Sequence, residues 1–189
     1  MTALSAVAQS PIAVAAMAEP TLHYIPYERF LDEVEALAVQ LEADEWKPDF
    51  LVGIGRGGLV PAAYLSHRTG LQMLSVDHST KDSGFGDELL DKLAAKIRDG
   101  ARILIVDDIN DSGGTINYLR AAIEAKVETP DRLRVAVLVH NVRSKARAEY
   151  HGSEIDRDRD KRWFVFPWEA VAPKATLKVE ALAVPERLA

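Results

Sequence analysis

The chain has 189 residues, a formal net charge of −6 and no cysteine. This length suits one domain with a substantial core. The acidic balance argues against nonspecific nucleic-acid binding, and the lack of cysteine excludes disulfides, zinc–thiolate sites and a cysteine nucleophile. No apolar stretch approaches the length of a membrane-spanning helix. We therefore expect a cytoplasmic globular protein that binds neither nucleic acid nor a membrane.

The N-terminal segment is rich in alanine and uncharged, but it does not have the features of a signal peptide. It lacks a basic start, and Gln9, Ser10 and Pro11 interrupt its apolar run. We expect a disordered leader over residues 1–20, a single domain over 21–170, and a C-terminal tail over 171–189.

An amphipathic helix is predicted over 26–43, followed by a buried strand at 50–54 and a helix at 59–69. The glycine-rich turn Gly53–Gly58 formally matches the G-x-G-x-x-G fingerprint of dinucleotide-binding proteins. A strand ending at Asp77 supplies an acid at about the spacing that this fingerprint requires. An NAD-binding protein is therefore one interpretation.

Residues 77–87 are polar, contain glycine and show no periodicity, which is typical of a surface loop. We favour a lid that closes over a substrate, with Ser79 and Lys81 as candidate contacts. A short helix is predicted next, over 89–98.

The central stretch combines a buried strand at 103–106 with the acids Asp107, Asp108 and Asp111. The turn that follows contains Ser112, Gly113, Gly114 and Thr115, and it leads into a helix over 116–123. Free backbone N–H groups at the start of a helix bind phosphate. Carboxylates crowded beside a phosphate suggest a hydrated Mg²⁺ ion.

A second buried strand, at 134–139, ends at His140, where α/β proteins place ligands. The densely charged stretch 143–162 is expected to be a solvated excursion. Trp163 and Phe164 follow it and could supply a face on which a flat heteroaromatic base stacks.

Three strings together resemble the type I phosphoribosyltransferases. Val106–Thr115 matches the family's motif for phosphoribosyl pyrophosphate (PRPP). Arg56–Ala62 resembles the pyrophosphate loop of xanthine-guanine phosphoribosyltransferases, including a cis peptide at Gly55–Arg56. Trp163–Glu169 resembles the base-binding hood of the 6-oxopurine enzymes. The resemblance implies an α/β fold: a twisted, mostly parallel sheet flanked by helices, with a small hood built from N- and C-terminal segments.

The resemblance also implies an activity, namely transfer of ribose 5-phosphate from PRPP to hypoxanthine, guanine or xanthine. The products would be the nucleoside monophosphate and pyrophosphate, as in purine salvage. The implied enzyme is a Mg²⁺-dependent pentosyltransferase, and family members are usually homodimers or homotetramers.

The residue roles that the resemblance implies are as follows. Asp111 is the catalytic base; Arg56 and Gly57 bind pyrophosphate; Asp107 and Asp108 bind the ribose or Mg²⁺; Ser112, Gly113, Gly114 and Thr115 bind the 5′-phosphate; Trp163 stacks on the base, Phe164 contacts it through its backbone, and Glu169 assists a second Mg²⁺.

His140 departs from the family pattern, because purine enzymes of this group usually have a lysine there to contact the 6-oxo group. Imidazole can also donate a hydrogen bond to an oxo group. The preferred base therefore stays open. The alternatives are a phosphoribosyltransferase for another base, a PRPP-binding regulatory protein with little catalysis, and the NAD-binding protein.

Overall fold

The computed structural model describes residues 19–76 and 83–184, with the backbone alone for 83–87 and 130. Most of the expected leader and the candidate lid contacts Ser79 and Lys81 lie outside the described residues. No helix in the described ranges is both long and apolar enough to cross a membrane.

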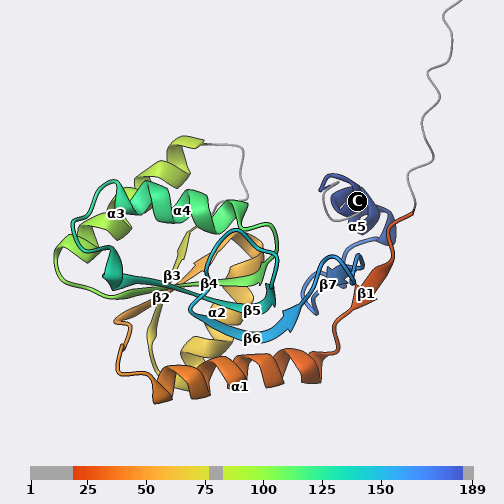
Figure 1. The fold of residues 1–189 in the computed structure, drawn as a ribbon, viewed down its shortest axis with the longest axis horizontal. Helices are drawn as coiled ribbons and strands as arrows, with labels where there is room; N and C mark the ends of the chain where they lie inside the picture. The colour runs from red at the N-terminus through yellow and green to blue at the C-terminus, as the bar shows by residue number, and fades with distance from the viewer. Residues whose placement is uncertain (1–18, 77–82, 185–189) are drawn as a thin grey trace, which may run out of the picture.

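A parallel sheet forms the centre of the fold (Figure 1). Its strands, in spatial order, are β3 (Gln72–Val76), β2 (Phe50–Ile54), β4 (Ile103–Asn110), β5 (Leu133–Asn141) and β6 (Tyr150–Ile155). All four neighbouring pairs are parallel. The carboxyl ends of the strands therefore meet along one edge, which is where α/β proteins bind ligands.

Helices cover both faces of the sheet, because side chains alternate along each strand. Leu104 and Val106 of β4 pack in one core with helices α1 (Tyr27–Ala43) and α2 (Gly55–Thr69). On the opposite face, Ile103 and Ile105 of the same strand pack in a second core with α3 (Ser83–Arg98) and α4 (Gly114–Glu124). A short 3-10 helix, η1 (Pro130–Arg132), leads into β5.

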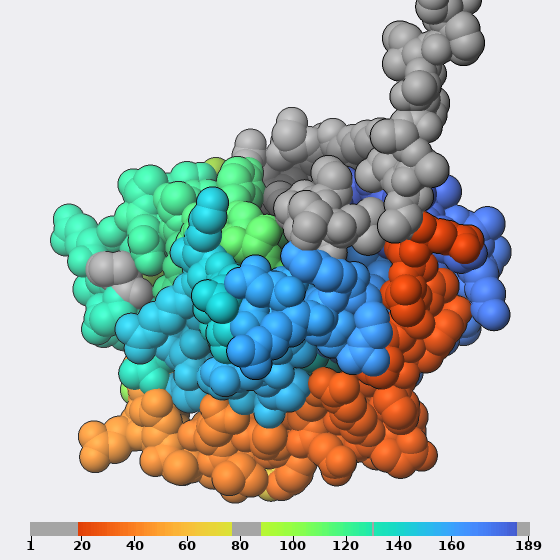
Figure 2. Space-filling model, turned by 45° about the vertical axis from the view of Figure 1, so that its right-hand side comes forward, coloured from red at the N-terminus to blue at the C-terminus, as the bar shows by residue number. Residues whose placement is uncertain are grey.

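A small hood forms beside this domain. Strand β1 (Leu22–Tyr24) pairs in parallel with β7 (Trp163–Val165), so that the two ends of the described chain meet. Figure 2 shows the N-terminal segment, in red, against the blue C-terminal segments. The expected fold class, including the hood from both ends of the chain, is thus confirmed.

The stretch beyond residue 171, expected only as a tail, contains helix α5 (Lys174–Leu182). Leu177 and Ala181 are buried and hold this helix in place.

The expectation of a solvated excursion over 143–162 is wrong. This segment contains β6, whose edge is covered by α1: Tyr150 is buried, and Ser153 donates a hydrogen bond to the buried Glu33. Polar residues are tolerated there because they pair with α1. Arg157, in the same segment, is also buried.

Three further expectations need correction near the sheet edge. Helix α2 begins at Gly55 rather than at Leu59, and β4 continues to Asn110 rather than ending at Val106. The strand continues because its last residues still pair with β5. The peptide between Gly55 and Arg56 is trans, not cis.

Candidate active site

The carboxyl ends of β2 and β4 open into a cavity of about 440 Å³. One wall carries predicted site residues: Arg56, Gly57, Asp107 and Asp108. The opposite wall belongs to the C-terminal segment and is formed by Trp168, Glu169, Val171, Ala172, Thr176, Leu177 and Glu180. The structure therefore brings the predicted pyrophosphate loop, the paired acids and Glu169 together around one space.

The first turn of α2 lies directly on the end of β4. A Cβ atom at Gly57 would stand 2.5 Å from Oδ2 of Asp108, and one at Gly58 would stand 2.1 Å from the carbonyl oxygen of Val106. Both distances are far below van der Waals contact. A Cβ at Gly58 would meet packed backbone, so glycine is required there, whereas a Cβ at Gly57 would force the carboxylate of Asp108 to move. This close approach places Arg56 beside the acids. Its side chain is 81% exposed and lies 3.6 Å from Glu180 of α5.

Asp107 is half-buried at this edge. Burial raises the pKa of its carboxyl to about 7, although the backbone N–H of Asp108 donates to its Oδ1 at 3.0 Å and opposes the shift. A nearby cation would favour the ionised form.

The resemblance to the phosphoribosyltransferases implies Mg²⁺, and the donor set around the cavity fits a hydrated ion. Mg²⁺ is usually held by one or two carboxylates, several waters and substrate phosphate oxygens. Asp107 and Asp108 would supply the carboxylates. The described residues contain no group of three acids or histidines placed to hold a metal alone. Oε2 of Glu169 accepts a hydrogen bond from the backbone N–H of Phe166, which fixes the turn after β7.

The predicted phosphate loop lines a separate small hollow at the start of α4. Its lining comprises Ile109, Asn110, Asp111, Ser112, Gly113, Gly114, Thr115 and Ile116. Gly113 has φ +88°, and a Cβ there would lie 2.5 Å from the backbone nitrogen of Ala146. The loop after β5 supports this turn from behind, since the backbone N–H of Lys145 donates to the carbonyl of Ser112 at 3.2 Å. The hollow thus combines hydroxyls with backbone N–H groups at a helix N-terminus, as an anionic phosphate requires.

His140 is held in one tautomer by the fully buried Asn110. Nδ2 of Asn110 donates to the carbonyl of Ala146 at 2.8 Å and contacts Nδ1 of His140 at 3.1 Å, while its Oδ1 accepts from Ser144 at 2.6 Å. Because Nδ2 can only donate, Nδ1 must accept, and the ring proton lies on Nε2. Burial, together with the proximity of His151, lowers the pKa of His140. A neutral imidazole with an N–H donor at Nε2 results.

Asp111 forms a buried ion pair with Arg157, which sequence reasoning did not single out. The two residues are 7% and 5% exposed, and Nη2 of Arg157 lies 2.9 Å from Oδ2 of Asp111. Asn141, at the end of β5, donates to the backbone carbonyl of Asp111 at 3.1 Å. The missed residues are Asn110, Asn141 and Arg157. Asn141 directly follows His140 at the end of a predicted strand, and that position could have identified it, whereas Arg157 follows a strand that the sequence did not predict.

Two of the predicted base-binding residues, Trp163 and Phe164, differ in exposure. Phe164 is buried, with its ring 4.9 Å from the guanidinium carbon of Arg157 and 5.3 Å from the ring of His23. Its side chain is therefore part of the hood's core. Trp163 is only partly buried.

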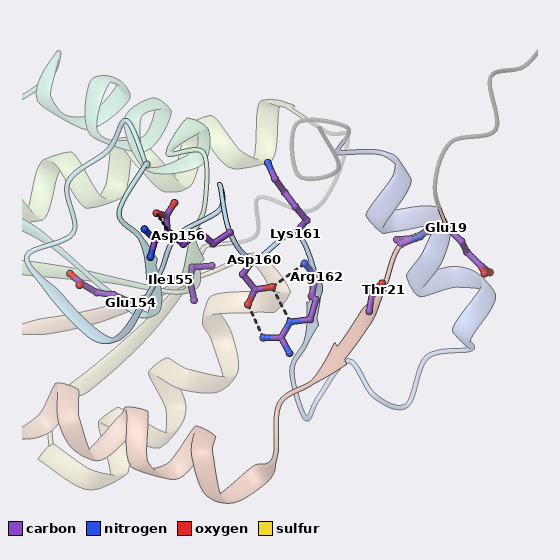
Figure 3. Close-up of a pocket in the computed structure, with 10 residues that line it drawn as sticks. Glu19, Thr21, Glu154, Ile155, Asp156, Asp160, Lys161 and Arg162 are labelled. Atoms are coloured by element: carbon purple, nitrogen blue, oxygen red, sulfur yellow. Dashed lines mark hydrogen bonds and ion pairs between the residues drawn. The ribbon is translucent and has the colours of Figure 1, made fainter.

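A larger, more open cavity of about 650 Å³ lies elsewhere, between the N-terminal segment, the end of β6 and the loop 156–162 (Figure 3). It contains none of the predicted site residues. Charged side chains line it and pair with one another, as Asp160 and Arg162 do. The predicted chemistry is concentrated around the smaller cavity and the phosphate hollow instead.

Comparison with known proteins agrees with this geometry. Residues 25–172 match the family described as the phosphoribosyl transferase domain. A xanthine-guanine phosphoribosyltransferase of Gluconobacter oxydans is 26% identical over 155 residues, which cover 79% of this chain and 86% of that protein.

Two solved structures show the same fold. A purine phosphoribosyltransferase from Pyrococcus horikoshii has a TM-score of 0.58 at 23% identity, with 80% of this chain and 97% of that one covered. A xanthine-guanine-hypoxanthine phosphoribosyltransferase from Helicobacter pylori has a TM-score of 0.57 at 23% identity, with 78% and 93% covered.

The chain belongs to the phosphoribosyltransferase family, and its class of enzyme is the pentosyltransferases. The family match favours the PRPP interpretation of the glycine-rich turn at 53–58 over the dinucleotide interpretation, since it covers that turn and the phosphate loop together.

Proposed function

We propose that this protein transfers ribose 5-phosphate from PRPP to a 6-oxopurine, giving a nucleoside monophosphate and pyrophosphate. The observation that carries the proposal is the convergence of two anion-binding features at one sheet edge. The first turn of α2, with Arg56, forms one wall of a cavity together with Asp107 and Asp108. The phosphate hollow lies at the start of α4, just beyond these acids along the chain. PRPP carries a pyrophosphate and a 5′-phosphate on one ribose, so it needs two such sites.

In the proposed reaction, a ring nitrogen of the purine forms a bond to C1′ of the ribose while the bond from C1′ to the pyrophosphate oxygen breaks. The positive charge that develops on the sugar is stabilised by nearby carboxylates. Asp107 and Asp108 would hold the ribose hydroxyls, and Asp111 would take or share the proton of the purine N7. Bound Mg²⁺ would neutralise the departing pyrophosphate.

The choice of a 6-oxopurine is supported by the tautomer of His140. A donor at Nε2 suits the carbonyl oxygen at C6 of hypoxanthine, guanine or xanthine. The amino group of adenine would instead present a donor to this donor, which leaves both unpaired. The name of the Gluconobacter relative agrees with this preference. Trp163 would stack on the base and the backbone of Phe164 would contact its edge.

The test is pyrophosphate release from Mg-PRPP with hypoxanthine, guanine, xanthine, adenine and orotate in parallel. We expect release with at least one 6-oxopurine and none with adenine or orotate. Release with adenine or orotate alone would identify an enzyme for another base. PRPP binding without release would identify a regulatory protein instead.

We further propose that the protein acts in the cytoplasm, in purine salvage, as a homodimer or homotetramer. Light scattering during size-exclusion chromatography tests the assembly, and a monomer at micromolar concentration would contradict it.

A further inference from the structure

We propose that Arg157 is a positioning residue of the reaction, which fixes the carboxylate of Asp111 and connects it to the base-binding hood. The inference rests on the proposed function, because it assigns Arg157 a role through Asp111. Arg157 lies between β6 and β7, in the segment 156–162.

The burial of the pair is the first argument. Asp111 and Arg157 are almost fully removed from solvent. A buried charge is strongly unfavourable without a hydrogen-bonded partner. Asp111 also adjoins the phosphate hollow and follows Asp107 and Asp108 closely in the chain. Arg157 therefore offsets negative charge where the substrate brings more.

The geometry of the guanidinium is the second argument. Nε of Arg157 lies 3.1 Å from both carboxylate oxygens of Asp111, and Nη2 lies 2.9 Å from Oδ2. On its other side, Nη1 donates to the backbone carbonyls of Asp160 at 3.1 Å and Arg162 at 2.6 Å. One planar group thus joins the carboxylate to the chain immediately before Trp163. A lysine ammonium has no fork that could span both.

The segment that receives these bonds is itself held in place. Figure 3 shows Asp160 and Arg162 facing each other, and the two are paired at 2.7 Å. The Arg162 guanidinium lowers the pKa of Asp160 to about 2, so this pair stays ionised at every physiological pH. A second connection runs through Asn141, whose Oδ1 accepts from the backbone N–H of Arg157 and whose Nδ2 donates to the carbonyl of Asp111.

The consequence for the reaction follows from these contacts. The hood that would receive the base and the carboxylate that would take its proton form one hydrogen-bonded unit. The Nε–H of Arg157 is shared between both oxygens of Asp111, and Nδ2 of Asn141 lies 3.5 Å from Oδ1. A purine N–H would therefore bind this carboxylate by replacing one of these weaker contacts. Arg157 limits the directions from which that bond can be made.

The test compares three variants of the full chain with the wild type: Arg157→Met, Arg157→Lys and the control Arg159→Met. Arg159 lies in the same segment, but its side chain is 88% exposed. We expect Arg157→Met to lower kcat by about 10²-fold or more, the usual size of an acid–base contribution, while KM for PRPP changes less than about threefold. Arg157→Lys should recover part of the loss, and Arg159→Met should match the wild type.

Arg157→Met removes the guanidinium partner of the buried Asp111 and therefore also affects folding. A double variant separates this effect from the effect on kcat. Asp111→Asn and Asp111→Asn/Arg157→Met should have equal kcat, because the effect of Arg157 on turnover is exerted through the Asp111 carboxylate. Both are first shown to be folded by circular dichroism.

Three results would overturn the inference. They are an unchanged kcat in Arg157→Met, a loss confined to KM for PRPP, and a further large loss of kcat in the double variant. Failure of the proposed function is distinguishable, since the wild-type chain would then release no pyrophosphate with any base, and the inference would fall with it.

Discussion

The turn at Gly113 allows a sharp test of how the phosphate loop is built. Its φ of +88° lies in the left-handed region, and a Cβ would meet the backbone nitrogen of Ala146 at 2.5 Å and the Cβ of Ala146 at 2.8 Å. We predict that Gly113→Ala destabilises the protein and weakens PRPP binding, because the loop after β5 must move away from the turn.

The expected magnitude has two parts. The left-handed conformation costs a residue with a Cβ about 1–2 kcal/mol. Forcing an extra methyl group against packed backbone costs about 1–3 kcal/mol. The total of about 2–5 kcal/mol corresponds to a Tm at least about 4 °C lower in a chain of this length.

Gly114→Ala is the matched control, since the nearest atom to its Cβ would be Oγ of Ser112 at 3.6 Å and its φ is not positive. Its stability should equal that of the wild type or exceed it by up to about 1 kcal/mol. Thermal unfolding followed by circular dichroism, with and without Mg-PRPP, measures both effects. Equal Tm values for Gly113→Ala and the wild type would refute the reasoning.

Three further predictions concern single side chains. Asp111→Asn should lower kcat about 10²–10⁴-fold in a pyrophosphate-release assay. The Kd for PRPP, measured by calorimetry, should stay near that of the wild type. Wild-type turnover in this variant would show that Asp111 is not the catalytic base. His140→Leu should raise KM for the base about 3–10-fold through loss of one hydrogen bond, with PRPP binding as the unaffected control. Burial raises the pKa of Glu33 above its ordinary value of 4.5. The native state therefore binds more protons than the unfolded state, and the free energy of unfolding falls as the pH rises from about 4.5 through the raised pKa. Glu33→Gln should lack this part of the loss, and urea unfolding at pH 5 and pH 8 would show parallel pH dependences in the two proteins if the argument is wrong.

Local pattern predicted the framework of this fold well. The apolar runs around Val52, Ile105 and Val137 identified the three central strands, since each is buried on both faces. The phosphate loop was also predictable, because glycines and hydroxyl residues between a strand and a helix are typical of a phosphate-binding turn.

The strand β6 and the partner of Asp111 could not be predicted in the same way. Tyr150–Ile155 is an edge strand whose polar side chains pair with residues of α1 that are more than a hundred positions away, such as Glu33 with Ser153. Arg157 lies among other charged residues and differs from its exposed neighbour Arg159 only in what folds around it. Charge alone does not reveal burial when the compensating charge comes from a distant segment.

Helix α5 has a consequence for selective inhibition. The family match ends at residue 172, yet Thr176, Leu177 and Glu180 form part of the wall facing Arg56 and the paired acids. A compound that mimics pyrophosphate and extends toward this wall would contact residues outside the region shared across the family. A basic group on that extension would meet the carboxylate of Glu180. We expect such a compound to discriminate this protein from relatives whose C-terminal segment differs at these positions.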